Sequence, residues 1–373
     1  MKNKHFYLMA AMGISVFGLC SCSDNDAPGI DSSATASNAI RFAANTELAS
    51  RAGDITTNNL KQFYVYAYTG TDSVPELFMD NVTVSKSDNN TWTYSPIKYW
   101  PAHQTVDFYA FAPAWVGASG PLKPVTYENY PGIEDIVYAV SPDLSGHTDG
   151  PNAQVVFNFR HALSKITVKM SSTNENLQVK VSNVSLVNIM MYGNFNFPSG
   201  STSQIIPEGT TTPGAVSPES IGKWTDQNSP AVYVLHNARS ADERIVLNST
   251  PTNIASASSL SMGTQFLIPQ PLVWNSNGGG KDTYISVKGA IYDAKTGDKL
   301  WPNENTPPEN VLTGDTFGDG LMKFPLSTSK LINWIPGCHY IYNMVINANE
   351  EMGAIEFGTP TVDSFVDVES TYQ

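Results

Sequence analysis

The stretch that decides the fold class is Lys165-Ile166-Thr167-Val168-Lys169-Met170. Apolar and polar residues alternate along it. Successive side chains of a β-strand point to opposite faces of a sheet, so this period of two predicts a strand. We expect its isoleucine, valine and methionine to face a core, and Lys165, Thr167 and Lys169 to face outward.

The same alternation recurs along most of the chain, in segments at Lys61 to Tyr68, Val106 to Phe111, Leu177 to Val181, Ala231 to Leu235, Tyr284 to Tyr292 and His339 to Ile346. Ile291 to Leu300 has the pattern of a hairpin, in which Gly297 is free to adopt a positive φ in the turn. Helical periodicity is weak throughout. Short strands separated by clusters of Gly, Pro, Asn and Ser predict antiparallel β-sandwiches, with a domain junction in the turn-rich stretch from Ser141 to Pro151.

Composition agrees with an all-β chain that works outside the cytoplasm. Charged residues make up only 15% of the 373 residues, against about 25% in an average globular domain. Hydrophobic residues make up 41%, and a chain of this length can bury the cores of two domains. The formal net charge of -13 would repel the phosphates of nucleic acid, so no nucleic-acid partner is expected.

The N-terminus predicts export as a lipoprotein. A basic start is followed by an apolar stretch from Phe6 to Leu19, which at about 14 residues is shorter than the roughly 20 that a spanning helix needs. It ends in Leu19-Cys20-Ser21-Cys22, which resembles the bacterial lipobox. Cys22 is the expected lipidation site because a small residue precedes it, whereas Leu19 is too large for the place before Cys20. Residues 1–22 are therefore predicted to be a signal peptide.

The residues after Cys22 refine the expected location. Ser23-Asp24-Asn25-Asp26 resembles the acidic tetrapeptide that directs Bacteroidetes lipoproteins to the outer face of the outer membrane; an ordinary solvated linker is the alternative. Residues 23–37 are rich in Ser, Ala, Pro and Gly and predict a flexible tether. We expect an outer membrane lipoprotein exposed at the cell surface and anchored by the lipid on Cys22.

No motif predicts catalysis, a metal or a cofactor. Cys338 is the one cysteine left after Cys20 and Cys22, which excludes an internal disulfide and a multi-cysteine metal site. Asp315 to Gly320 lacks the alternating carboxylates of a calcium loop. Glu134 and Asp135 are neighbours on an extended segment, so they make a poor acid–base pair. His161 follows a buried-looking strand and is interpreted as structural, and no enzymatic activity is expected.

Three segments carry a resemblance to a known family. They are Tyr99-Trp100-Pro101 with Val106 to Pro113, then Phe157 to Ile166, and Trp334 to Asn343. In this order they resemble the Trp-Pro … Phe-x-Ala-x-x-Pro, Phe-x-His-x-Leu-Ser and Trp-x-Pro-Gly-x-x-Tyr-x-Tyr motifs of the Bacteroidetes fimbrillins.

The resemblance implies a fold and a function. It implies a structural subunit of a type V pilus, or fimbrium, with two transthyretin-like antiparallel β-sandwich domains and Greek-key-type connections, which we assign to residues 38–150 and 151–373. Such subunits are exported as lipoproteins, assemble by donor-strand exchange and contribute to cell adhesion. Cys338 falls at a variable position of the last motif, which implies no role of its own.

The resemblance also implies proteolytic processing near the start of the mature chain. Asn38 to Glu47 is a candidate first strand, with Ile40, Phe42 and Ala44 on one face. In the family a trypsin-like protease removes the first strand by cutting after an arginine. Arg51, followed by Ala52, fits this role, whereas Arg41 lies inside the strand; an ordinary loop arginine is the alternative at Arg51.

Removal of the first strand would leave an apolar groove with unpaired backbone groups, which favours pairing with a strand of another subunit. The C-terminal region offers alternating residues for this role: Ile355, Phe357, Phe365, Val366 and Val368. The alternative is that these are the last strands of their own domain. Expected partners are pilus subunits of the same or another kind, the protease, and a host protein or glycan. The sequence leaves three positions of the subunit in the pilus open: stalk, tip and anchor.

A second class of function is a surface lipoprotein that binds glycan. Aromatic side chains that stack on sugar rings are common in such modules. Candidates here are Trp92, Tyr94, Tyr99, Trp100 and Trp115. The alternative is that most of these rings pack between the sheets.

Overall fold

The computed structural model describes residues 39–46, 54–56, 58–71, 73–146, 154–203, 218–256, 265–275, 280–329, 331–346 and 361–364. All of them belong to the compact unit Asn38–Gln373. Their regular structure consists of strands and short 3₁₀ helices, namely η3 (Pro218–Ser220), η4 (Ala241–Glu243), η5 (Ile254–Ser256) and η6 (Pro308–Asn310). The predicted all-β fold class is confirmed.

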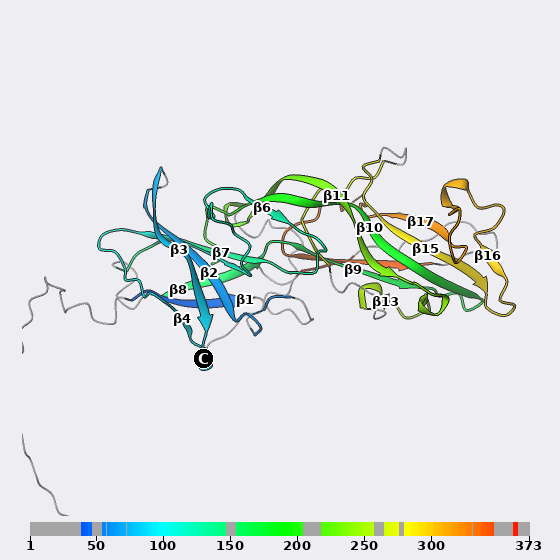
Figure 1. Ribbon diagram of the computed structural model, residues 1–373, viewed down its shortest axis with the longest axis horizontal. Coiled ribbons are helices and arrows are strands. Elements are labelled where there is room, and N and C mark those ends of the chain that lie inside the picture. The colour runs from blue at the N-terminus through cyan, green and yellow to red at the C-terminus, as the bar shows by residue number, and fades with distance from the viewer. Residues whose placement is uncertain are drawn as a thin grey trace, which may run out of the picture. The chain divides into compact units, whose positions relative to one another are not determined.

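The first sheet has seven strands in the order β1-β8-β7-β5-β2-β3-β4 (Figure 1). Their bounds are β1 (Arg41–Thr46), β2 (Gln62–Thr71), β3 (Val74–Lys86), β4 (Trp92–Tyr94), β5 (Val106–Ala112), β7 (Val137–Leu144) and β8 (Gln154–His161). Every one of these strands contributes side chains to a single core cluster. The two edge strands meet across this core, since the rings of Phe42 and Tyr94 lie 5.0 Å apart. The sheet therefore curls around its own core.

Two further sheets form a sandwich. One has the order β11-β10-β15-β16, with β6 and β12 paired to β10 and β17 paired to β15; the other has the order β13-β9-β18-β19, with β14 paired to β9. The bounds are β6 (Val125–Glu128), β9 (Ser164–Ser171), β10 (Leu177–Asn196), β11 (Lys223–Asn237), β12 (Ile245–Val246), β13 (Thr252–Asn253), β14 (Gln265–Leu267), β15 (Tyr284–Asp293), β16 (Lys299–Trp301), β17 (Gly320–Pro325), β18 (Cys338–Val345) and β19 (Thr361–Ser364). Both sheets turn apolar side chains into one shared core.

Most pairings are antiparallel, as predicted, but two are parallel. β1 pairs in parallel with β8, and β18 pairs in parallel with β9. β8 also pairs with β7, so the chain leaves the first sheet after His161. This change of sheet comes later than the predicted junction from Ser141 to Pro151. The assignment of domains to residues 38–150 and 151–373 stays a prediction.

The stretch Lys165–Met170 forms most of β9, as its period of two predicts. Its isoleucine, valine and methionine lie in the core of the sandwich. The expectation of an outward polar face is wrong for Lys165 and Thr167, which are each only 4% exposed, whereas Lys169 is half-buried. Thr167 Oγ1 lies 2.8 Å from Nε2 of His339 on β18, and Lys165 pairs with a distant aspartate. Both polar side chains are thus buried with a partner.

The other predicted strands are present and often longer. The segment predicted at Leu177 to Val181 is the start of β10, which runs for 20 residues. Three register irregularities interrupt its pairing with β11, which a pattern of strict alternation does not reveal. The predicted hairpin joins β15 to β16, and Gly297 in its turn has a φ of 79°.

The first sheet is covered on its second face too. Tyr66 on β2 and Phe111 on β5 are buried there with Val116 and Val125. The Trp115 ring stacks on Phe197 at 5.7 Å. The connection after β5 therefore covers a face that alternation alone would leave to solvent.

We expect Phe63→Ala to destabilise the protein by about 3–5 kcal/mol, the usual cost of emptying a buried phenylalanine site. The Phe63 ring is fully buried and contacts Trp92, Phe157 and Phe159 at 4.8, 5.7 and 5.3 Å. Urea unfolding measures the change. The matched control is Lys61→Ala at an exposed position, which should stay within about 0.5 kcal/mol of wild type; equal losses in both variants would contradict this account of the core.

Candidate functional site

The first strand is anchored by one phenylalanine. The Phe42 ring on β1 is enclosed by the rings of Tyr94, Phe157, Phe108 and Phe63, at centroid distances of 5.0, 5.7, 6.0 and 6.3 Å. Three of these contacts are edge-to-face, a favourable geometry for aromatic pairs. These four rings, called the aromatic box below, come from β4, β8, β5 and β2. One side chain of β1 thus contacts most of the first sheet.

The backbone of β1 is held on both sides. On one side it pairs with β8, where Phe42 lies opposite Val155. On the other side, at Ile40 directly before β1, the backbone N donates to Lys98 O at 2.9 Å, and the Tyr94 hydroxyl donates to Ile40 O at 2.9 Å. Burial raises the pKa of Tyr94, which keeps this hydroxyl a donor. β1 therefore fills a groove between β8 and the segment after β4.

Loss of β1 would uncover this groove. Ile40 and Phe42 are 1% and 3% exposed and belong to the core. Without them the aromatic box would face water on one side. β8 would also lose its partner along residues 154–159. An apolar face beside unpaired backbone groups is a template for another strand.

The chain is fixed again at Asp54. Lys165 Nζ donates to Asp54 Oδ1 at 2.6 Å, and the two side chains form an ion pair. Both are almost fully buried, at 1% exposure for Asp54 and 4% for Lys165. Burial raises the pKa of Asp54, and the bond to Lys165 opposes that shift. This pair joins the segment after the first strand to β9.

A second carboxylate supports the same segment. Ile55 N donates to Asp135 Oδ2 at 2.9 Å, and Nδ1 of His161 lies 2.8 Å from the same oxygen. Asp135 and His161 are each 3% exposed. The structural role predicted for His161 agrees with this arrangement. We call Asp54, Lys165, Asp135 and His161 the buried clasp.

Most of the predicted site residues lie outside the described residues. These are Cys22, Arg51, Ala52, Ile355, Phe357, Phe365, Val366 and Val368. Arg51 falls in the connection between β1, which ends at Thr46, and Asp54. The predicted processing site thus falls, in sequence, between two described elements, β1 and the buried clasp.

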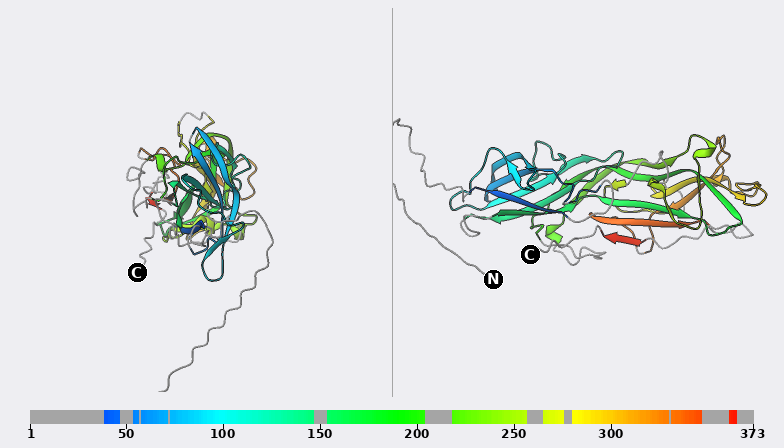
Figure 2. Two further views of the ribbon diagram at one scale, coloured as in Figure 1. Left: turned by 90° about the vertical axis from the view of Figure 1, so that its left-hand side faces the viewer. Right: turned by 90° about the horizontal axis from the view of Figure 1, so that it is seen from below.

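One short piece of the C-terminal region is described. β19 pairs antiparallel with β18, with Cys338 opposite Ser364 and Ile341 opposite Thr361 (Figure 2). It lies at the end of its sheet's strand order and spans only four residues. Part of the candidate donor region therefore adds to the edge of β18.

The clasp is the part of the site that sequence reasoning missed. Lys165 stands at a polar position of an alternating strand, and Asp54 lies 111 residues away. No spacing in the sequence links two such residues. Neither the lysine in β9 nor the aspartate that follows the predicted cleavage site gives a local signal, so only the fold brings them together.

Other candidate groups are engaged within the fold. Asp315 accepts hydrogen bonds from the backbone N of Phe317 and Asp319, both at 2.9 Å. Asp319 pairs with Arg244 at 2.5 Å. Among the described residues, no group of three or more His, Cys, Asp or Glu side chains is placed to hold a metal. No helix in the described part of the chain is both long and apolar enough to span a membrane.

The aromatic residues considered for glycan stacking mostly pack inside the protein. Trp92 lies 4.8 Å from Phe63, and Tyr94 is part of the aromatic box. Trp100 and Trp115 are partly buried against core clusters. Tyr99, at 50% exposure, is the one of the five that offers a largely open ring. These side chains do not form a platform.

Comparison with known proteins decides the family. The fimbrillin-like family model matches residues 50–363. The chain belongs to the fimbrillin-like family. No curated protein matches the chain.

Solved structures of similar proteins cover most of this fimbrillin-like chain. A proposed cell adhesion protein from Bacteroides uniformis has a TM-score of 0.47 at 13% identity, over 89% of this chain and 100% of that one. The tip fimbrial protein Mfa3 from Porphyromonas gingivalis has a TM-score of 0.38 at 10% identity, over 82% and 94%. The fimbrial anchor protein Mfa2 of the same organism has a TM-score of 0.33 at 10% identity, over 88% and 99%.

We expect Asp54→Ala to cost about 3–5 kcal/mol of folding free energy, because it leaves Lys165 buried without its carboxylate. Replacing both partners by apolar residues, as in Asp54→Leu with Lys165→Met, should restore most of the loss. Thermal and urea unfolding of the three proteins measure this. If the double variant is no more stable than Asp54→Ala, the ion pair is not what holds the segment.

Proposed function

We propose that this fimbrillin-like chain is a structural subunit of a type V pilus that contributes to adhesion. It is exported as a lipoprotein on Cys22 and assembled by protease-triggered donor-strand exchange. The observation that carries the proposal is the placement of β1. This strand completes the core of the first sheet, yet a connection that contains Arg51 joins it to the rest of the chain.

The two anchors on either side of Arg51 support cleavage at that position. A cut between Arg51 and Ala52 releases everything up to and including β1, together with the lipid. It leaves Asp54 in the buried clasp and Ile55 bonded to Asp135. The new N-terminus, Ala52, would therefore lie two residues before Asp54, which its ion pair with Lys165 holds in place. Cleavage would open the groove without loosening the segment that leads into β2.

The open groove favours an incoming strand for two physical reasons. Burial of apolar surface stabilises an occupant by roughly 25 cal/mol per Å², and Phe42 and Ile40 mark where two large side chains fit. The unpaired backbone of β8 supplies hydrogen bonds to any extended segment beside it. An isolated subunit gains neither of these, so the processed chain is driven towards another subunit.

The C-terminal region contains a segment that matches the side-chain pattern of β1. Ile355-Glu356-Phe357-Gly358-Thr359 repeats the spacing of Ile40, Phe42 and Ala44, with a large aliphatic residue, then a phenylalanine, then a small residue at every second position. Phe357 would enter the aromatic box. The match favours a second copy of this chain as the partner, and hence a stalk position. Release of the four residues of β19 from β18 would free the segment.

We expect Arg51→Ala to leave the lipidated precursor uncut and unpolymerised. The test incubates the precursor with the trypsin-like protease and follows multimers on gels. The matched control is Arg239→Ala, which changes an exposed arginine elsewhere and should assemble like wild type. A ladder of multimers from Arg51→Ala would overturn the proposed mechanism.

We further expect Phe357→Ala to reduce multimer formation at least tenfold after normal cleavage, because the aromatic box would stay empty. Glu356→Ala, at the neighbouring position that would face outward, should assemble like wild type. Quantified gel ladders of the processed proteins make the comparison. If both variants assemble fully, Ile355 to Thr359 is not the donor segment, whereas the role of Arg51 would be judged separately by its own variant.

A further inference from the structure

A row of three lysines crosses the outer face of the sheet formed by β10, β15 and β17. Lys180 on β10 lies opposite Ala290 on β15, and Lys323 on β17 lies opposite Ser286 on β15. Lys288 stands between these two β15 positions on the same face. Each lysine is thus diagonal to the next one on the adjacent strand, and diagonal neighbours lie about 7–8 Å apart. We call Lys180, Lys288 and Lys323 the lysine row.

The row faces away from the sandwich core. One direct sequence neighbour of each row lysine packs in the core and is at most 2% exposed: Val179, Val287 and Phe324. Alternate residues of a strand point to opposite faces. Lys323 is exposed, and Lys180 and Lys288 are half-buried. The three ammonium groups are therefore available on one surface.

Within the three strands no acidic residue stands among the row lysines, while Asp282 lies near Tyr284 at one end and Asp319 pairs with Arg244 near the other. β10 and β17 contain no Asp or Glu, and β15 contains only Asp293 at its last position. Within the described ranges, no lysine of the row forms an ion pair. Yet the whole chain has 34 acidic and 21 basic residues. Diagonal neighbours are still within reach of long side chains, so the three like charges repel one another and a bound anion would relieve that repulsion.

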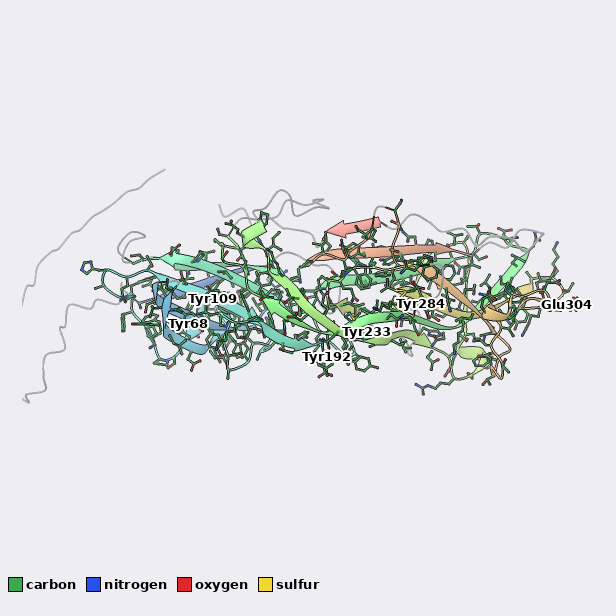
Figure 3. The ribbon with its side chains drawn as sticks, turned by 90° about the horizontal axis from the view of Figure 1, so that it is seen from above. Tyr68, Tyr109, Tyr192, Tyr233, Tyr284 and Glu304 are labelled. Carbon is green, nitrogen blue, oxygen red and sulfur yellow. The ribbon has the colours of Figure 1, made fainter. Side chains whose placement is uncertain are left out.

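A tyrosine flanks each end of the lysine row. At one end, Lys180 Nζ lies 5.0 Å from the centre of the Tyr292 ring, and Lys299 Nζ lies 5.8 Å from it. At the other end, Lys323 Nζ lies 5.5 Å from the ring of Tyr284, which is labelled in Figure 3. Both tyrosines are half-buried, and the Arg244 guanidinium also lies 5.8 Å from the Tyr292 ring. The lysine row thus has an aromatic ring close to the lysine at each of its ends.

We propose that this face binds an anionic polysaccharide, a sugar polymer with carboxylate or sulfate groups. The lysines would pair with successive anionic groups along the polymer, and the tyrosines would stack on its sugar rings. Nucleic acid is the less favoured occupant. It carries a charge about every 1.7 Å, and a chain with a net charge of -13 repels so dense an anion more strongly. The proposal goes beyond pilus assembly and uses a surface distinct from the groove of β1.

The test is a binding titration of the full chain in detergent with chondroitin sulfate, followed by calorimetry. We expect Kd to weaken at least tenfold in the variant with Lys180→Gln, Lys288→Gln and Lys323→Gln. The matched control carries Lys61→Gln, Lys123→Gln and Lys223→Gln at exposed sites and should bind like wild type. Equal weakening in both variants would mean that net charge alone is responsible and would overturn the site.

Two further measurements separate the chemistry of the occupant. Tyr284→Ala should weaken chondroitin sulfate binding severalfold while leaving any weak binding of polyglutamate unchanged, since only a sugar stacks on the ring. Tighter binding of polyglutamate or single-stranded DNA than of chondroitin sulfate would overturn the polysaccharide assignment.

Lys288→Gln alone should raise Tm, because it removes the central repulsion of the row; an unchanged or lower Tm would contradict the argument from like charges. None of these results depends on whether Arg51 is cut.

Discussion

The fit of Phe42 into the aromatic box is the interaction on which the rest of the first sheet depends. The ring joins β1 to strands from both ends of the strand order. Because β1 also pairs with β8 and bonds to the segment after β4, it closes a sheet that would otherwise have two separate edges. A core that needs one edge strand for closure is stable while that strand is present and strongly favours a replacement when it is absent.

The buried clasp would make the proposed replacement of β1 compatible with a folded subunit. Burying an ion pair gives little net stability, but breaking one is costly. In the proposed processing, Asp54 and Lys165 would therefore fix where the remaining part of the chain begins. Asp135 serves the same end through Ile55 and His161. The fold thus separates a strand held by apolar contacts, which another strand can supply, from a segment held by specific charges, which it cannot.

The positions of the strands were predictable from the sequence, whereas the burial of their polar side chains was predictable only in part. Alternation located β2, β5, β9, β15 and β18 because one face of each strand meets a core. It failed for Lys165, whose buried partner lies 111 residues away, and for Tyr66, which is covered by the connection after β5. The motifs predicted the family, which the family model confirms. The parallel place of β1 and the buried clasp depend on contacts between distant segments, which periodicity does not encode.

The central claim is that the lipid on Cys22 is a temporary tether, discarded together with β1. Mass spectrometry of the mature N-terminus, on pili sheared from cells and on the membrane fraction of the same cells, tests it most directly. The account predicts chains that begin at Ala52 in the pili and at acylated Cys22 in the membrane. Assembled subunits that begin at acylated Cys22 would contradict it.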